Sequence, residues 1–166
     1  MEQFFASSPR GLESPLAGEL GALGAQRLQQ VPGGVAFAGD WGLCYRANLW
    51  SRLASRILWR VAEFGYAAED DLYKAAREVD WPRLFAVERT LRVNVSAQKS
   101  PLKSLDFATL RIKDAVCDRF RDSLGSRPSV DRASPQVRVH AFLDAARGAL
   151  YLDTSGEPLF KRGWRA

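Results

Sequence analysis

The strongest pattern in the chain is a helical period over residues 104–124, which reads SLDFATLRIKDAVCDRFRDSL. At about 100° per residue the apolar side chains fall on one arc, which predicts an amphipathic helix with a core-facing stripe. Ser104 or Asp106 can cap the first turn, and Gly125 stands where a positive φ ends a helix. The predicted stripe consists of Leu110, Ile112, Val116, Cys117, Phe120 and Leu124.

The other face of this predicted helix is polar, with one exception. Lys113 falls inside the apolar arc, and two interpretations stay open: its stem lies along the core while the ammonium group reaches solvent, or the charge meets an anionic group. The remaining polar residues stand three or four positions apart, which predicts ion pairs on the helix surface rather than a catalytic pair of carboxylates. They are Arg111, Asp114, Asp118, Arg119, Arg121 and Asp122.

The first 65 residues alternate between short apolar runs and helical periods, separated by Gly and Pro turn signals. The order β-α-β-β-α-β is that of a ferredoxin-like unit, in which two helices cover one face of a four-stranded sheet. The predicted strands are Gln3–Ala6, Arg27–Val31, Val35–Ala38 and Ile57–Phe64, and the helices run from Pro9 to Leu23 and from Trp41 to about Leu53.

The second half of the chain starts a new series of elements. Acidic residues open a helix over Glu69–Val79, where the helix dipole favours them. Apolar and polar residues then alternate in three further stretches, which predicts half-buried strands in which Arg92 and Arg138 lie on the polar side. These strands are Thr90–Ala97, Gln136–Asp144 and Ala149–Asp153. The predicted fold class of the whole chain is therefore α+β.

Composition excludes several classes of protein. Hydrophobic residues make up 46% of the chain and charged residues 26%, which predicts a folded core. No apolar run approaches the ~20 residues that a membrane span needs, and the N-terminus does not read as a signal peptide. Cys44 and Cys117 are isolated, so we expect buried thiols in a reducing compartment rather than a disulfide or a metal site. The expected location is the cytoplasm, with no membrane partner.

The net charge of +5 is unevenly distributed. Residues 1–98 carry 11 Lys and Arg against 11 Asp and Glu, whereas residues 99–166 carry 13 against 8. A basic surplus in one half favours a surface there that faces a polyanion. An ordinary solvated surface in an arginine-rich chain is the alternative.

The motifs of catalysis are missing from this sequence. It contains no nucleotide-binding glycine motif after a strand, no phosphate-binding loop, no nucleophile elbow and no metal-ligand spacing. The single histidine, His140, alternates with Arg138 on a predicted strand, which is more typical of a structural residue than of a catalytic one. The residues therefore indicate a binding module rather than an enzyme.

Six segments carry a resemblance to a known family. They are VPGGVAF from Val31, WSRLASRIL from Trp50, DLYKAAREVDW from Asp71, LRIKDAVCDRF from Leu110, RPSVDRASPQVRV from Arg127 and LDTSGEPLFKRGWR from Leu152. With these segments the chain resembles, over essentially its whole length, the N-terminal region of bacterial 23S rRNA guanine-N2 methyltransferases. In that family a ferredoxin-like subdomain is followed by a THUMP domain.

The resemblance implies a division into a ferredoxin-like subdomain over 1–65, a THUMP domain over 66–154 and a linker stub over 155–166. The linker leads toward a methyltransferase domain that the sequence does not contain, because the S-adenosylmethionine site and the Asn/Asp-Pro-Pro-aromatic motif of that domain are not present. The resemblance therefore implies S-adenosylmethionine for the parent protein, no cofactor in this chain, and structured rRNA and the C-terminal methyltransferase domain as partners.

Cations on loops suit the phosphates and exposed ends of structured RNA. The basic half of the chain and the resemblance together lead us to expect RNA contacts at Lys99, Lys103, Lys113, Arg127, Arg132, Lys161, Arg162 and Arg165.

Two other functions compete with RNA binding. Older descriptions of the family as DNA methylases make the nucleic-acid-binding part of a DNA (adenine) methylase one alternative. A protein–protein docking module is the other, because aromatic residues lie outside the basic half at Trp41, Trp50, Trp59 and Trp81. These tryptophans lie mostly on apolar stripes, so we expect them in the core, with Trp50 beside Leu43 and Ala47.

Overall fold

A computed structural model describes residues 1–155, which fold into two compact units. The first unit comprises residues 1–60 together with 153–155, and the second comprises residues 61–152. The strand β4 (Arg56–Gly65) contributes residues to both units. The fold class is α+β, as predicted from the sequence.

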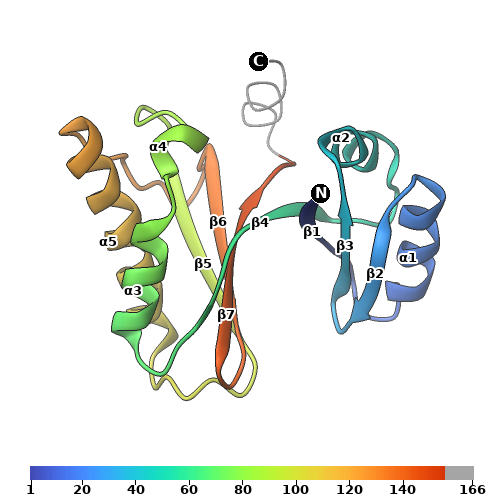
Figure 1. Ribbon diagram of the computed structural model, residues 1–166, viewed down its shortest axis with the longest axis horizontal. Helices are drawn as coiled ribbons and strands as arrows, with labels where there is room; N and C mark the ends of the chain where they lie inside the picture. The colour runs from blue at the N-terminus through green and yellow to red at the C-terminus, as the bar shows by residue number, and fades with distance from the viewer. Residues whose placement is uncertain (156–166) are drawn as a thin grey trace. The chain divides into compact units, whose positions relative to one another are not determined.

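The first unit has the ferredoxin-like topology. Its strands lie in the order β2-β3-β1-β4 and are antiparallel throughout, and its two helices pack on one face of the sheet (Figure 1). This arrangement confirms the predicted β-α-β-β-α-β order. The elements are β1 (Glu2–Ser7), α1 (Glu13–Ala22), β2 (Gln26–Val31), β3 (Gly34–Gly39), α2 (Trp41–Trp50) and the first part of β4.

The core of the first unit lies between this sheet and its two helices. Phe4 of β1 and Phe37 of β3 stack with ring centroids 5.4 Å apart, and both are almost fully buried. Leu16 and Leu20 cover them from α1, while Leu43, Cys44 and Ala47 cover them from α2. Alternate residues of β1 and β3 therefore face the helices, as the period-two pattern predicts.

Both helices are shorter than the sequence predicts. We expected the first to begin at Pro9, but Gly11 adopts a positive φ of +97° and the helix begins at Glu13, with Pro15 in its first turn. We expected the second to reach Leu53, but it ends at Trp50 because the Glu19 carboxylate accepts hydrogen bonds from the backbone of Arg52 and from the Ser51 hydroxyl. These contacts hold the chain in an extended turn.

The early end of α2 overturns the expected position of one tryptophan. Trp50 is 67% exposed, although the helical wheel places it beside the buried Leu43 and Ala47. It is the last residue of the helix, and the backbone becomes extended at the next residue, Ser51. Trp81 is fully buried as expected, and Trp41 and Trp59 are half-buried with ring centroids 4.8 Å apart.

Gly34 allows a close approach of β3 to β1 that no other residue permits. A Cβ at this position would overlap the carbonyl oxygen of Ala6 and the ring of Phe5. We expect Gly34→Ala to lower the free energy of unfolding by at least about 2 kcal/mol, because backbone and ring must both move. The matched variant is Gly18→Ala in the middle of α1, which meets no atom within 4 Å. Gly18→Ala should raise the free energy of unfolding by roughly 0.5–1 kcal/mol. Urea unfolding followed by circular dichroism measures both, and equal effects would contradict the assigned overlap.

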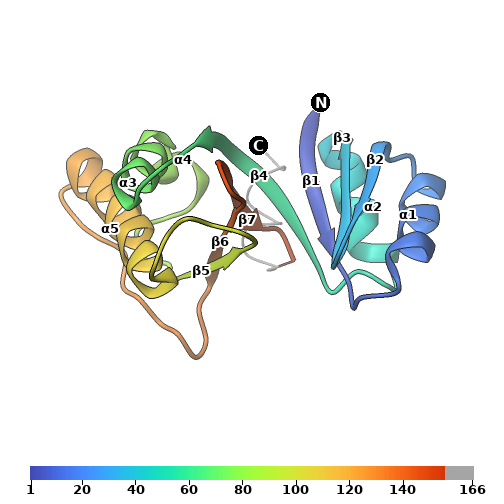
Figure 2. The same cartoon turned by 90° about the horizontal axis from the view of Figure 1, so that it is seen from below.

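The second unit packs two helices on one face of a further set of strands. Its strands lie in the order β4-β7-β6-β5, with β5 and β6 parallel and β6 and β7 antiparallel. The helices α3 and α5 lie side by side on that face, as Figures 1 and 2 both show. The elements are α3 (Glu69–Glu78), α4 (Trp81–Leu84), β5 (Leu91–Ala97), α5 (Leu105–Leu124), β6 (Val137–Leu143) and β7 (Arg147–Asp153).

The helix α5 has the predicted ends, but its buried stripe is rotated. Ser104 accepts a hydrogen bond from the backbone N–H of Phe107, and Gly125 ends the helix at φ +75°. Leu110 and Leu124, which the sequence places in the core, are exposed. The rotation arises because α3 packs along α5 and buries two small residues in place of Leu110, while Leu124 is the last residue before the chain turns away. The buried residues are Ala108, Ile112, Ala115, Val116, Cys117 and Phe120.

Candidate nucleic-acid interface

The strands of the second unit carry polar residues on the face turned away from α3 and α5. Residues alternate along β5 and β6, so that Leu91, Val93, Val137 and Val139 are buried against the helices. The residues between them point to the opposite face. There, Arg92 pairs in register with Arg138 on the adjacent parallel strand. Adjacent strands are about 4.8 Å apart, so two guanidinium groups share one end of this face. The next rows of the face contain Asn94, Ser96, His140, Phe142 and Tyr151.

The loop after α5 brings a third arginine to the same place. Arg92 donates one hydrogen bond from Nε to Asn94 Oδ1 at 3.0 Å and another from Nη1 to the carbonyl oxygen of Arg132 at 2.8 Å. The loop also pairs with the start of β5, where the backbone N–H of Asp131 donates to the Leu91 carbonyl oxygen. Arg132 is exposed. We call Arg92, Arg132 and Arg138 the arginine end of the second unit.

The positive charge of the arginine end is not neutralised within the described part of the chain. Among residues 1–155, none of its three guanidinium groups forms an ion pair with a carboxylate. Asp131 is the acidic residue nearest to Arg132 in sequence, and its Oδ1 accepts hydrogen bonds from the backbone N–H groups of Ala133 and Ser134. Unpaired like charges close together raise the local potential and favour a bound anion.

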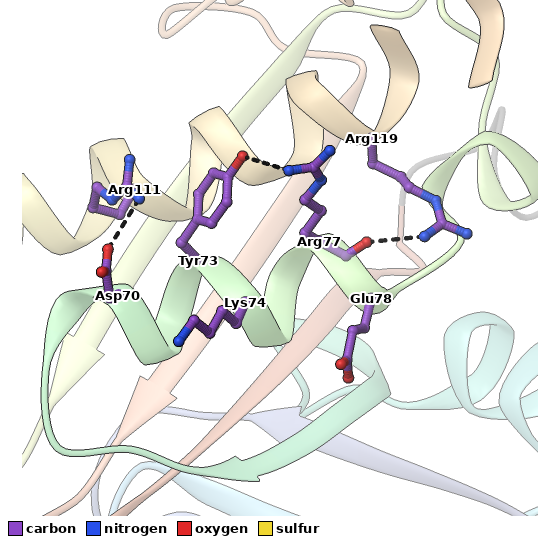
Figure 3. Close-up of a pocket in the computed structure, with 7 residues that line it drawn as sticks. All are labelled: Asp70, Tyr73, Lys74, Arg77, Glu78, Arg111 and Arg119. Carbon is purple, nitrogen blue, oxygen red and sulfur yellow. Dashed lines mark hydrogen bonds and ion pairs between the residues drawn. The ribbon is translucent and has the colours of Figure 1, made fainter. Parts of the chain in front are cut away.

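The helical side of the second unit is also rich in arginine, and four of its arginines are paired with carboxylates. A shallow depression of about 550 Å³ lies between α3 and α5 (Figure 3). Arg111 forms an ion pair with Asp70 at 3.2 Å, and its guanidinium lies 4.3 Å from the ring centroid of Tyr73. Arg77 pairs with Asp122, which raises the pKa of Arg77. The residues that line the depression are Asp70, Tyr73, Lys74, Arg77, Glu78, Arg111 and Arg119.

The remaining contacts of this depression also join one helix to another. Arg119 donates a hydrogen bond to the carbonyl oxygen of Arg77 at 3.2 Å and lies 3.8 Å from an oxygen of Asp80. The Tyr73 hydroxyl donates to Asp118 at 2.6 Å, and this hydrogen bond raises the pKa of Tyr73. The three arginines that line the depression are therefore held by ion pairs and offer less free charge to a polyanion than the arginine end does.

These contacts correct the predicted pattern of ion pairs. We expected the arginines of α5 to pair with aspartates of the same helix. Arg121 and Asp118 do so at 3.0 Å, three residues apart. Arg111 and Arg119 instead reach Asp70 and Asp80 outside α5. A helical wheel of α5 could not show these two pairs, because it contains no information on the residues that pack against the helix.

The structure places the predicted RNA-binding residues at two separate ends of α5. Lys99 and Lys103 precede its first turn and are exposed; Lys99 adopts φ +57°, which fixes the turn between β5 and the helix. We call these two residues the lysine end. Arg127 and Arg132 follow the last turn. A helix of 20 residues is about 30 Å long, so the lysine end and the loop after α5 are not one patch.

Two predicted residues contact their own helix. Lys113 is half-buried, with Nζ 3.3 Å from Asp114 Oδ1, in agreement with a stem that lies along the core and a charge that reaches the surface. Arg127 hydrogen-bonds to the thiol of Cys117. Burial raises the pKa of that thiol, and the Arg127 guanidinium opposes the rise. Lys161, Arg162 and Arg165 lie outside the described residues.

Sequence reasoning did not select Arg92 and Arg138, although their signal was present. Both stand on the polar side of strands that the alternation predicts, one residue after the first buried position of each strand. The parallel pairing of β5 with β6 then aligns them. A search for cations at equal positions in consecutive predicted strands would have found the pair.

Other chemistry is not evident in the described residues. Within residues 1–155, no group of three or more His, Cys, Asp or Glu side chains is suited to hold a metal ion. Over the same residues, no helix combines the length and the apolar character needed to cross a membrane. Cys44 and Cys117 are free and buried, and burial raises the pKa of Cys44 to about 12.

Comparison with known proteins identifies similar chains. A protein from Syntrophotalea carbinolica, "Ribosomal RNA large subunit methyltransferase K/L", is 43% identical over 164 residues; the match covers 99% of this chain and 23% of that protein. This chain therefore spans about a quarter of the length of that relative.

Solved structures share the fold. A putative methyltransferase complexed with SAH has a TM-score of 0.78 and 25% identity, and the match covers 99% of this chain and 44% of that one. A predicted N6-adenine-specific DNA methylase from Listeria monocytogenes also has a TM-score of 0.78, at 23% identity, over 92% of this chain and 40% of that one. Because the Listeria monocytogenes protein is only 23% identical, its similarity to this chain shows the fold alone.

Family models match both units of the chain. The RlmL ferredoxin-like domain matches residues 3–58, and the THUMP domain matches residues 66–153. The second match covers more than half of the chain and includes the arginine end, the lysine end and the whole of α5. The chain therefore belongs to the THUMP domain family, and a ferredoxin-like domain of the RlmL type precedes its THUMP domain.

Proposed function

We propose that this chain is an RNA-binding module that positions structured rRNA for an S-adenosylmethionine-dependent guanine-N2 methyltransferase domain outside the sequence. The name of the Syntrophotalea carbinolica relative, a ribosomal RNA large subunit methyltransferase, supports rRNA as the substrate class. The relative is about four times as long as the match, which leaves room for a separate catalytic domain.

One observation carries the proposal: three arginines gather at one end of a strand face of the second unit without a carboxylate partner among residues 1–155, whereas four arginines on its helices are paired. Arg77, Arg111, Arg119 and Arg121 on the helices each have a carboxylate partner. The arginine end has none among residues 1–155. Phosphate groups bind favourably to cationic side chains because binding releases mobile counterions. A cation that already pairs with a carboxylate of the protein would first have to give up that ion pair. We therefore assign the main RNA contact to the arginine end.

We propose the other predicted cations as further contacts of a longer RNA. The lysine end follows the last residue of β5, whereas Arg92 stands at its start, so the lysine end suits a second stretch of the same stem. Lys113 lies on α5 and Arg127 in the loop after it, and both interact with Cys117. Lys161, Arg162 and Arg165 remain proposed contacts outside the described residues.

S-adenosylmethionine belongs, in this proposal, to the domain outside the chain. The depression between α3 and α5 is lined by charged side chains that pair with one another, so these residues do not fit the adenosine of the cofactor. We propose the cytoplasm, where ribosomal RNA is found, as the location of the protein.

We also propose the domain limits that the resemblance implies: 1–65 ferredoxin-like, 66–154 THUMP and 155–166 linker. Limited proteolysis followed by mass spectrometry tests them. First cuts after residue 155 and near 65 support this division, whereas first cuts within either interval contradict it.

Fluorescence anisotropy of the 166-residue chain with an rRNA stem-loop, over a series of salt concentrations, tests the function. We expect binding that weakens steeply with salt, because each phosphate contact adds about 0.7–0.9 to the slope of log affinity against log salt. DNA of the same sequence is the matched control. Preference for RNA supports the proposal, equal binding to DNA favours the DNA methylase alternative, and no binding to either contradicts nucleic-acid binding.

A further inference from the structure

The outward face of α2 exposes large apolar side chains in the first unit. Tyr45 is 47% exposed, Leu49 58% and Trp50 67%. Tyr45 and Leu49 stand one turn apart on the side of α2 opposite the buried Leu43 and Ala47, and Trp50 follows Leu49 as the last residue of the helix. Tyrosine and tryptophan carry much of the binding energy of protein interfaces, and clustered exposed apolar residues mark such sites. We call Tyr45, Leu49 and Trp50 the α2 patch.

The chain returns from the second unit to the same helix. The Thr154 hydroxyl accepts a hydrogen bond from Asn48 Nδ2 at 3.2 Å and donates one to the Ile57 carbonyl oxygen at 2.7 Å. The backbone N–H of Ile57 donates to Ser155 Oγ at 3.1 Å. Asp153, buried, forms an ion pair with Arg56. Residues 153–155 are thus anchored at α2 and the start of β4.

The anchor and the α2 patch are neighbours on one helix. Asn48, which holds Thr154, precedes Leu49 and follows Tyr45 by three positions, within one turn. The proposed linker of residues 155–166 therefore starts close to the α2 patch, and a domain joined to its end would be tethered within its reach. A short connection gives such a domain an effective concentration in the millimolar range, so even a small interface would be occupied.

We propose that the α2 patch is the docking surface for the methyltransferase domain of the longer protein. The proposal rests on the proposed function, which places that domain beyond the linker of residues 155–166. The similar chains are long enough to contain it, since this chain spans 23%, 40% and 44% of the three described above. No acidic residue and only one cation, Arg46, lie on α2, so the face is better suited to an apolar protein surface than to phosphates.

Hydrogen exchange measured by mass spectrometry on residues 40–53 tests the docking. One sample is the 166-residue chain, and the other is a full-length chimera in which this sequence replaces the matching 164 residues of the Syntrophotalea carbinolica relative. We expect exchange in α2 to be slower in the chimera by about tenfold or more. Leu49→Ala with Trp50→Ala should return the chimera to the rates of the 166-residue chain. Leu124→Ala, an equally exposed leucine on α5 at 55%, is the matched control and should leave α2 protected.

The other occupants of the α2 patch give different results. Equal exchange in both samples, or protection that survives the double variant, overturns the proposal. The proposal is also overturned if the 166-residue chain forms a dimer in sedimentation experiments and Trp50→Ala abolishes that dimer. The partner of the α2 patch would then be a second copy of this chain. RNA binding that the double variant weakens assigns the patch to RNA and also overturns docking. Unchanged RNA affinity in the double variant supports it. Absence of any RNA binding contradicts the proposed function alone, because the exchange experiment contains no RNA.

Discussion

The double variant Arg92→Glu, Arg138→Glu is expected to bind an rRNA stem-loop at least about a hundredfold more weakly than the parent chain. The two residues are paired in register on adjacent parallel strands and have no carboxylate partner among residues 1–155. Reversal removes two phosphate contacts and places two negative charges where phosphates would lie. The slope of log affinity against log salt should fall by about 2, since each phosphate contact contributes about 1.

The matched control makes the same change in charge on the helical side of the second unit. Lys74 on α3 and Arg83 on α4 are exposed, and Lys74→Glu with Arg83→Glu alters the net charge equally. We expect this pair to weaken binding by less than about fivefold, through long-range electrostatics that salt screens. Equal losses from both pairs would show that net charge alone drives binding. Full affinity after reversal at the arginine end would contradict the assigned surface.

A milder variant separates binding from folding. Arg92 donates to Asn94 and to the carbonyl oxygen of Arg132, so its replacement also loosens the loop after α5. Arg92→Gln with Arg138→Gln keeps polar, hydrogen-bonding side chains and removes the positive charges without adding negative ones. An intermediate loss of affinity with unchanged circular dichroism would assign the effect to charge.

The order of the elements was predictable because it depends on local patterns. The period-two alternation in β5 and β6 places Leu91, Val93, Val137 and Val139 in the core, and the structure confirms all four. The cap at Ser104 and the stop at Gly125 are also local signals, and both are confirmed. Such features are set within a few residues of the chain, so one sequence suffices to read them.

Features that depend on a second element were not predictable in the same way. Whether Arg111 pairs within α5 or with Asp70 depends on α3, which lies 41 residues away in sequence. The burial of Ala115 in place of Leu110 depends on the same helix contact. The arginine end requires the register of β5 with β6, which a single sequence does not contain. The charge count assigned the basic surplus to residues 99–166, so it did not include Arg92, and it could not distinguish paired arginines from unpaired ones.

The two tryptophans that the sequence treats alike, Trp81 and Trp50, should respond oppositely to replacement by alanine. Trp81 is fully buried, packs with Phe85 at a centroid distance of 6.4 Å, and donates a hydrogen bond from Nε1 to the Ala76 carbonyl oxygen at 2.7 Å. Trp81→Ala should lower the free energy of unfolding by about 3–5 kcal/mol, because it leaves a large cavity and removes the hydrogen bond to the Ala76 carbonyl oxygen.

Trp50→Ala changes a residue that is 67% exposed and should alter stability by less than about 0.5 kcal/mol. Urea unfolding of the 166-residue chain, followed by far-ultraviolet circular dichroism, measures both variants. The comparison also separates the two roles of tryptophan, since Trp81 supports the unit that contains the arginine end and Trp50 lies on the α2 patch. A large loss of stability in Trp50→Ala would mean that this side chain packs inside the first unit, and the α2 patch would then lose its most exposed member.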